Sequence, residues 1–568
     1  MSGGLTNYGD AGFSLFLRKA FIKAMGYSED ALNRTVVGIV DTGSGYNACH
    51  RNAPEIIEAV KRGVMLQGGL PIDFPTISLH ESFSHPTSMF LRNLMAMDTE
   101  EMIRAQPMDA VVMIGGCDKT VPAQLMAAAS AGVPAIEVVT GPMMTGSHEG
   151  ERLGACTDCR RFWGLYRAGE VSEAEIEEIG GKLAPTAGTC MVMGTASTMA
   201  CMTEALGMML PGGAAIPAVA ADRLRHAEAA GARAVGMALE NLTPDQIMTP
   251  ESIANAFRIM LAIGGSTNGL VHMTAVAGRL GIEVDLEALD AMGRETPVLV
   301  DLKPSGQHYM EDLENAGGLT AVLRELKPLL NLDCLTVTGK TLGENIDAAP
   351  PSWPQDVVRP FDNPLFAEGG VAVLRGNLAP DGAIVKQSAA TPALMQAEGR
   401  AVVFDSLADL AARIDDPDLD VVAEDFLILR NAGPIGAPGM PESGYIPIPK
   451  KLAIAGVKDM VRMSDARMSG TAFGSIVLHI APEAAIGGPL ALVENGDRIR
   501  LDVPARQLEL LVDDEELARR RAGWTPPPPH AGSERGYLKL YLDHVNQAPG
   551  GVDFDFLTAS PTGAKTPV

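Results

Sequence analysis

Positive charge is scarce in this chain of 568 residues, because 45 lysines and arginines face 70 aspartates and glutamates and leave a formal net charge of -25. A surface of this sign repels the phosphates of nucleic acids and of anionic lipids at long range. We therefore expect a small metabolite as the partner, with no nucleic acid and no membrane. The metabolite can still be an anion, since a bound metal ion or a helix N-terminus reverses the field inside one cleft.

Signals for export and for a membrane span are also missing. The N-terminal sequence MSGGLTNYGDAGFSLFLRKAF has no basic head followed by an apolar core and a cleavage site. The most apolar long stretch, Met191 to Ala221, contains Glu204, Pro211 and Pro217, and so indicates a buried helix and turn. We expect a cytoplasmic protein. Seven cysteines, an odd number, then favour free thiols, metal ligands or catalysis over a disulfide framework.

The order of apolar runs predicts two domains of different class. Between residues 36 and 345, short β-branched runs alternate with longer helical stretches, which is typical of an α/β domain with a largely parallel sheet. The sequence DAAPPSWPQDVVRPFDNP, with its five prolines, indicates a connector. In GGVAVLRGNLAPDGAIVK, two strand-like runs flank a predicted turn at Pro380 to Gly382. The predicted organisation is an α/β domain at 1–346, a linker at 347–370 and a β-rich domain at 371–568.

Three cysteines occupy the same kind of place. Cys49, Cys117 and Cys190 each follow a glycine-containing turn and precede a predicted helix. In open α/β sheets ligands bind outside the carboxyl ends of the strands, so the three thiols are predicted to converge there. A lone cysteine is more often a small buried residue. Here Cys117 is followed by Asp118 and Lys119, which adds a carboxylate and an amine to the same turn.

A second cysteine signal is the C-x-x-C spacing of Cys156 and Cys159, which suits zinc or a redox pair. A structural zinc site needs four ligands, the chain has no second C-x-x-C, and the nearest upstream candidate is His148. We expect this segment to be a loop near the site.

Five separated motifs closely resemble the dihydroxy-acid and sugar-acid dehydratase family, the IlvD/Edd group. They are GGCDKTVPAQ, AGTCMVMGTASTM, GGSTNGLVH, GAPGMPE and DARMSGTAFG, and the resemblance covers nearly the whole chain. The stretches CTDCRRFWGLYRAGE and GDRIRLDVPARQLELLVDDEELARRRAGW look like the branch that acts on pentonates and related aldonates. Met468 stands where many dihydroxy-acid relatives have Phe, which leans the same way.

The resemblance implies a fold, an assembly and an activity. The fold is an N-terminal α/β domain and a C-terminal β-barrel-like domain with the active site between them, in a homodimer or homotetramer. The activity is dehydration of an aldonate, such as L-arabinonate, D-xylonate or a related pentonate or hexonate, to the 2-keto-3-deoxy acid.

Two metal groups are implied by the same resemblance. An iron–sulfur cluster, 2Fe-2S in preference to 4Fe-4S, would be held by Cys49, Cys117 and Cys190. Mg²⁺ would be held by Glu81, Asp118, Glu442 and a carbamylated Lys119. Carbamylation makes chemical sense, because an ammonium cannot bind Mg²⁺ whereas a carbamate offers a hard anionic oxygen. Without the resemblance, Lys119 would be a salt-bridge partner of Asp118 and the two glutamates ordinary exposed carboxylates.

Ser469, in DARMSGTAFG, matches the serine that acts as base in this family. A serine hydroxyl is a poor base near neutral pH, so a metal or cation must favour its deprotonated form. By a weaker resemblance Thr471 contacts the substrate carboxylate and Ser266 lines the pocket. The local alternative is that Ser469 or Thr471, and likewise Ser266, only cap helices.

Three other functions are open at this point. Dihydroxy-acid dehydratase of branched-chain amino-acid synthesis uses the same chemistry on a smaller, more apolar substrate. An iron–sulfur electron carrier would use the cysteines but would not need Ser469, Glu81 or Glu442. A zinc-stabilised binding protein would centre on Cys156 and Cys159.

Overall fold

The computed structural model describes residues 8–559, and no helix in that range is long and apolar enough to cross a membrane. The α-helices of the first half are α1 (Ala11–Ala24), α2 (Ala53–Leu66), α3 (Arg92–Ala105), α4 (Thr120–Ala131), α5 (Thr157–Ala168), α6 (Glu173–Gly180), α7 (Thr195–Ala205), α8 (Ala221–Glu240), α9 (Pro244–Ile247), α10 (Pro250–Ala262) and α11 (Thr267–Arg279). They are followed by α12 (Leu286–Glu295), α13 (Met310–Asn315), α14 (Gly318–Glu325), α15 (Leu342–Ala348), α16 (Leu407–Arg413), α17 (Lys450–Ile454), α18 (Asp514–Gly523) and α19 (Gly536–His544).

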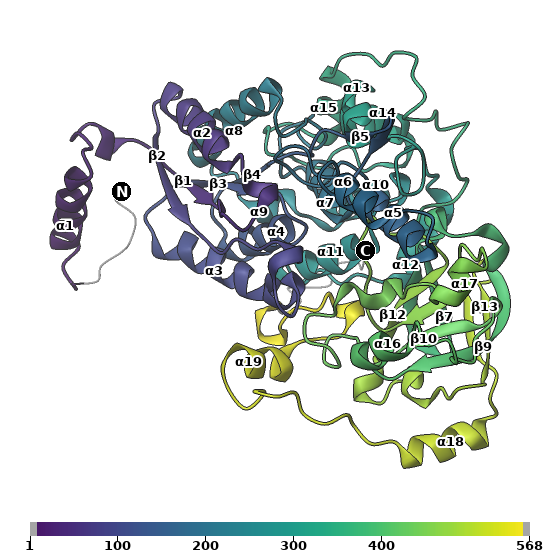
Figure 1. Ribbon diagram of the computed structural model, residues 1–568. Helices are drawn as coiled ribbons and strands as arrows, with labels where there is room; N and C mark the ends of the chain where they lie inside the picture. The colour runs from purple at the N-terminus through teal and green to yellow at the C-terminus, as the bar shows by residue number, and fades with distance from the viewer. Residues whose placement is uncertain (1–7, 560–568) are drawn as a thin grey trace.

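The N-terminal half is built on a parallel four-stranded sheet in the order β2-β1-β3-β4. Its strands are β1 (Val36–Asp41), β2 (Leu70–Pro75), β3 (Ala110–Gly115) and β4 (Ala135–Val139), and a separate hairpin pairs β5 (Gly146–His148) with β6 (Glu151–Leu153). All residues of β3 and β4 are buried, as expected for a parallel sheet covered on both faces. Figure 1 shows α2 and α8 on one side of the sheet and α3 and α4 on the other. The predicted α/β class is confirmed.

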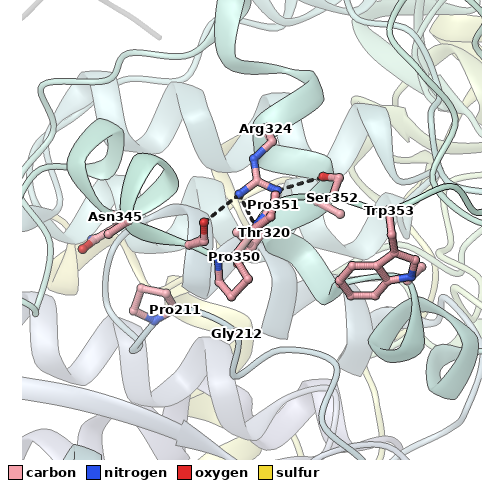
Figure 2. Close-up of a pocket in the computed structure, with 14 residues that line it drawn as sticks. Pro211, Gly212, Thr320, Arg324, Asn345, Pro350, Pro351, Ser352 and Trp353 are labelled. Carbon is pink, nitrogen blue, oxygen red and sulfur yellow. Dashed lines mark hydrogen bonds between the residues drawn. The ribbon is translucent and has the colours of Figure 1, made fainter.

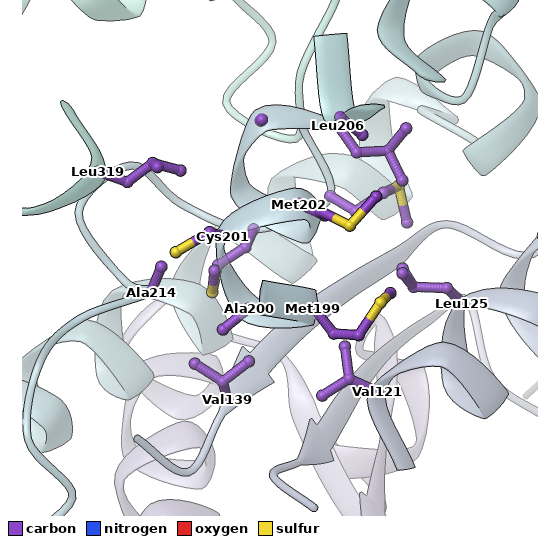
Figure 3. Close-up of a cluster of buried hydrophobic side chains, with 14 of the residues drawn as sticks. Val121, Leu125, Val139, Met199, Ala200, Cys201, Met202, Leu206, Ala214 and Leu319 are labelled. Atoms are coloured by element: carbon purple, nitrogen blue, oxygen red, sulfur yellow. The ribbon is translucent and has the colours of Figure 1, made fainter. Parts of the chain in front are cut away.

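Two of the cysteines predicted to bind the iron–sulfur cluster are each followed by a helix, and one hydrophobic core holds both helices in place (Figure 3). The α7 residues Met199 and Met202 and the α4 residues Val121 and Leu125 all belong to it, and each is fully buried. Because α4 follows Cys117 and α7 follows Cys190, this packing holds the N-terminal ends of both helices in a fixed relation.

The C-terminal half contains a closed, mixed barrel in the order β10-β11-β12-β8-β7-β14-β13-β9. Its strands are β7 (Ala372–Gly376), β8 (Ala379–Val385), β9 (Gln396–Phe404), β10 (Phe426–Leu429), β11 (Arg462–Ser464), β12 (Ile476–Ala481), β13 (Arg498–Asp502) and β14 (Gln507–Leu510). Alternate residues of these strands fill the barrel with a separate apolar core. The β-rich domain and the barrel that the resemblance implied are confirmed.

The predicted Pro-Asp-Gly turn in this barrel is wrong. The chain turns at Asn377 and Leu378, and Pro380 to Gly382 lie inside β8, opposite a shift in the pairing register between Leu374 and Gly376. The three residues form a bulge, which tolerates a proline without a backbone donor and a glycine with φ +111°.

Between Ala348 and Ala372 the chain has no helix or strand, and single bridges attach it to the first half at Val358 and Phe366. The proline-rich connector lies here, and the division at 346 and 370 stays a prediction. After the barrel the chain returns to the first half: Tyr541 of α19 packs against Phe90, and its hydroxyl accepts the Gly439 N–H at 3.0 Å. This tail therefore ties a barrel loop to the N-terminal half.

Candidate active site

The turns after β1 and β3 carry the first two predicted cluster cysteines. Cys49 lies in the short helical turn Ala48–His50, and Cys117 lies between β3 and α4. The His50 ring connects them, because its Nε2 accepts the Cys117 N–H at 3.0 Å and its Nδ1 lies 2.9 Å from the Thr42 carbonyl oxygen. Burial lowers the pKa of His50 to about 4, so the ring is neutral and Nδ1 carries the proton donated to Thr42. His50 therefore fixes one thiol turn against the other.

Five thiols gather at this edge of the sheet. Contact with the Cys117 thiol, together with burial and the charge on nearby Cys190, raises the pKa of Cys49. The Sγ of Cys190 lies 3.6 Å from the Sγ of Cys156. Contact with Cys156, and burial, raise the pKa of Cys190, whereas hydrogen bonds from Cys159 and Cys190 lower the pKa of Cys156. The C-x-x-C segment thus lies beside the predicted cluster ligands. His148, its candidate zinc partner, instead lies near Glu178, with Nδ1 3.8 Å from Oε1.

Lys119, the residue before α4, lies among acidic side chains from separate segments. Its side chain is 0% exposed, and its Nζ donates to Asp118 and, at 3.4 Å, to Glu81. Burial and the Arg467 cation would lower the pKa of Lys119, but its acidic neighbours outweigh them and the pKa is raised. Those neighbours are Asp118, Glu81 and Glu442. The other three residues predicted to bind magnesium therefore lie around the buried nitrogen of the fourth, Lys119.

Arg467, in the loop after β11, joins the two glutamates of this group. Its guanidinium donates to Glu442 at 2.7 Å, to Glu81 at 3.3 Å and to the Thr87 hydroxyl at 2.9 Å. Burial alone would raise the pKa of Glu81, but Lys119 and Arg467 lower it overall. Burial raises the pKa of Glu442 in spite of the arginine. Neither glutamate is the ordinary surface carboxylate that its local sequence favours.

Ser469 lies two residues after Arg467 and faces the N-terminal half. Its Oγ is 2.8 Å from the Thr471 Oγ1, which in turn accepts a 2.8 Å hydrogen bond from Arg160 of α5. The Thr157 hydroxyl donates to the Thr471 carbonyl at 2.9 Å. The helix that begins in the C-x-x-C segment therefore contacts the barrel loop directly, and the serine predicted to be the base lies at the junction of the two halves.

Ser266 has the local role that the sequence left open. It is the N-cap of α11, where its Oγ accepts the Asn268 N–H at 3.1 Å and lies 2.8 Å from the Thr195 hydroxyl. Its side chain is fully buried. The structure thus shows the cap, and the substrate contact stays a prediction.

The donor chemistry of this region suits the two implied metal groups. The group of thiols lies next to the acidic group, since the Cys117 Sγ is 3.4 Å from the Asp118 Oδ1. Within residues 8–559 no three His, Cys, Asp or Glu side chains already form a metal-binding group. The convergence of three carboxylates on the Lys119 nitrogen nevertheless fits a divalent cation, since carbamylation would replace its positive charge by a fourth anionic ligand. Soft thiolates fit iron.

A cavity of about 410 Å³ lies elsewhere, between α14, α15 and the proline-rich segment (Figure 2). Its most polar side chain, Arg324, donates to the Ser352 hydroxyl and to the carbonyls of Ala349 and Pro350. The guanidinium is therefore used to hold the connector in place, and none of the predicted site residues lines this cavity.

Two residues of the site, Arg467 and Arg160, were not identified from the sequence. Arg467 stands inside the motif DARMSGTAFG, two residues before the predicted base, and this position was the available signal. Arg160 follows the C-x-x-C pair directly. Each acts on a partner distant in the sequence, which no local spacing identifies.

Known families match the chain in two blocks. The dihydroxy-acid/6-phosphogluconate dehydratase N-terminal family matches residues 34–345, and the corresponding C-terminal family matches residues 356–552. L-arabonate dehydratase of Azospirillum brasilense is 48% identical over 97% of this chain and 96% of its own. 6-deoxy-6-sulfo-D-gluconate dehydratase of Pseudomonas putida is 45% identical over 95% and 93%, respectively. Dihydroxy-acid dehydratase of Agathobacter rectalis is 41% identical over 95% and 97%. The chain therefore belongs to the dihydroxy-acid/6-phosphogluconate dehydratase family and is a hydro-lyase.

Proposed function

We propose that the protein removes water from a sugar acid, an aldonate such as L-arabinonate, D-xylonate or a related pentonate or hexonate, and yields the 2-keto-3-deoxy acid. The observation that carries this proposal is the meeting of three groups from both halves of the molecule: the thiols, the acidic cluster around Lys119, and the Ser469 loop. The relatives named for sugar acids, at 45% and 48% identity, support the substrate class.

The chain would hold two metal groups. Cys49, Cys117 and Cys190 would bind a 2Fe-2S cluster, and Glu81, Asp118, Glu442 and a carbamylated Lys119 would bind Mg²⁺. When bound, these groups supply Lewis acids that polarise the oxygens of the substrate carboxylate and hydroxyls.

Ser469 is the base in this proposal. Arg160 donates to the Thr471 oxygen, so the Thr471 hydroxyl hydrogen is free to point at Ser469, 2.8 Å away. The backbone N–H of Thr471 also points at the Ser469 oxygen, at 3.5 Å. Donors aimed at one oxygen favour its anionic form. Deprotonated Ser469 takes the C2 proton, the C3–O bond breaks, and the departing hydroxide takes that proton from Ser469 and leaves as water. The enol then tautomerises to the 2-keto acid without net oxidation, and Ser469 is deprotonated again.

Arg160 favours a sugar acid over the rival substrate. The guanidinium comes from the segment that resembles the aldonate branch, and it brings positive charge and donors next to Thr471 and Ser469. A polyhydroxylated anion can use those donors, whereas the branched alkyl end of a dihydroxy acid would leave them unpaired. Turnover of an aldonate panel and of 2,3-dihydroxyisovalerate by enzyme reconstituted with iron, sulfide and Mg²⁺ tests this. We expect 2-keto acid from at least one pentonate or hexonate, and exclusive use of 2,3-dihydroxyisovalerate would refute it.

The cluster assignment has its own experiment. Replacing Cys49, Cys117 or Cys190 by Ser should remove visible absorbance and iron, because a hydroxyl is a poor ligand for iron in such clusters. Cys159→Ser should leave both in place. Cys156→Ser is the most informative control, because Cys156 lies close to Cys190. The assignment is overturned if Cys156→Ser loses iron while Cys190→Ser retains it.

The base assignment is tested with Ser469→Ala. This variant should keep iron and Mg²⁺ but lose turnover by about 10³-fold or more, since only the proton acceptor is removed. Near wild-type turnover of a C2-deuterated aldonate with the wild-type isotope effect would exclude Ser469. The homodimer or homotetramer stays a prediction that light scattering can check.

A further inference from the structure

Lys386 is a second fully buried lysine at the same junction, and neither the sequence motifs nor the proposed reaction uses it. It follows the last residue of β8, its side chain is 0% exposed, and its Nζ donates a hydrogen bond of 3.1 Å to the Gly470 carbonyl oxygen. Gly470 is the residue after Ser469. The amine thus binds the peptide unit that joins Ser469 to Thr471.

That peptide unit is clamped from the opposite side by the N-terminal half. A methyl group in place of the Gly470 hydrogen would lie 2.5 Å from the Ser266 Cβ and 2.8 Å from the Thr195 backbone nitrogen. Gly470 therefore has no room to move toward Ser266, and Lys386 holds its carbonyl from the barrel side. Together they fix the orientation of the Ser469 loop.

No carboxylate compensates this amine among the residues that the structure describes. Burial lowers the pKa of Lys386 to about 7, and no acidic neighbour contributes to the shift. Its hydrogen-bond partner, the Gly470 carbonyl, is neutral, and Ser388, two residues further along the chain, has its hydroxyl 2.9 Å from that of Ser305. Arg467, the charged residue nearest along the loop, is occupied by Glu81 and Glu442.

A polar side chain that never carries a charge would satisfy one carbonyl at lower cost than this amine, which is charged below about pH 7, so the buried lysine needs a reason. We propose that Lys386 is a positioning residue for Ser469, which holds the Gly470 carbonyl and, when protonated, places a positive charge beside the loop so that the deprotonated serine is favoured. This inference rests on the proposed function, in which Ser469 is the base. In a dry interior such a charge acts strongly on a neighbouring anion.

Kinetics of Lys386→Met and Lys386→Gln in the metal-loaded enzyme test the proposal. Met removes donor and charge, and Gln retains a donor without charge. We expect kcat to fall about 100-fold in Lys386→Met with KM within about threefold, because the effect is on proton removal. The acid limb of the kcat–pH profile should move up by about one unit or more in both variants, because the serine loses a proton less readily. A purely structural role would not shift that limb.

Ser388→Ala is the matched control, because it loosens the same segment without changing charge. We expect its pH profile to equal that of the parent. If Lys386→Met fails to fold, Lys386→Gln decides alone through its profile. The proposal is overturned if the Lys386 variants keep the parental kcat and acid limb while Ser469→Ala is inactive. If Ser469→Ala is itself active, the base assignment fails instead, so the two failures are distinguishable.

Discussion

Two lysines, Lys119 and Lys386, are buried to the same degree at the junction of the two halves, yet their surroundings differ completely. Lys119 is enclosed by carboxylates, which raise its pKa, whereas Lys386 meets one backbone carbonyl and burial lowers its pKa to about 7. Equal burial therefore gives opposite shifts, and the neighbours decide the charge. The N-terminal side of the site is built around compensated charge, whereas the barrel side holds an amine that has no carboxylate beside it and is only partly protonated near pH 7.

The strongest test of this contrast is Lys119→Met. In the metal-free protein with uncarbamylated Lys119, removing the cation leaves Glu81, Asp118 and Glu442 buried together with only Arg467, so we expect about 5 kcal/mol lower stability by urea unfolding. Magnesium binding and turnover should also be lost, the latter by about 10³-fold or more, if the carbamate is a ligand. Lys458→Met, at an exposed lysine, is the control that should change neither. Retained magnesium affinity in Lys119→Met would contradict the carbamate.

Lys386→Met should change the stability in the opposite direction and make the protein more stable. The pKa of Lys386 falls from 10.5 to about 7 on folding, so the unfolded chain binds more protons between these values and the parent gains stability as pH rises through them. The variant lacks this penalty, and we expect it to be about 4 kcal/mol more stable at pH 7, with the difference vanishing near pH 10.5. Urea midpoints measured from pH 7 to 10.5 check this. A difference independent of pH would show that the amine is compensated.

Arg467→Met tests the acidic group around Lys119. The loss of stability should be smaller than in Lys119→Met, because Glu81 keeps Lys119, Thr87 and Ser88 as partners. We expect a loss of about 3 kcal/mol at pH 7. The pKa of Glu81 is lowered in the folded protein, so its contribution is present above its ordinary value of 4.5 and lost as pH falls below it. The cost of the substitution should therefore shrink in acid. Adding Glu442→Gln should restore part of the loss, and strict additivity of the two would contradict the pairing.

Ser266→Ala gives the smallest expected change and separates the two roles of that residue. Loss of the N-cap of α11 should cost about 1 kcal/mol, measured as a urea midpoint shift. Thr249→Ala, at the cap of α10, should cost a similar amount and serves as the reference. A KM increase of more than about threefold in Ser266→Ala alone would add a substrate contact to the cap.

Local patterns predicted the elements around the thiols well. Cys49 and Cys117 stand at strand-to-helix turns because a buried β-branched run, a glycine turn and a helix start are each written in neighbouring residues. The same local reasoning misplaced the hairpin turn after β7. Pro380 to Gly382 have turn-forming chemistry, but pairing with β7 on one side and β12 on the other makes them a bulge inside a strand.

The family resemblance supplied the candidate site residues, and the sequence also contained the class of both halves. Only the tertiary structure decided which of the buried polar side chains contact one another. Arg467 pairs with Glu81 across 386 positions of chain, Arg160 reaches Thr471 across 311, and Lys386 reaches Gly470 across 84. Backbone propensity and apolar periodicity act over a few residues, so they determine elements, whereas the pKa and role of a buried charge depend on neighbours that long-range packing alone brings together.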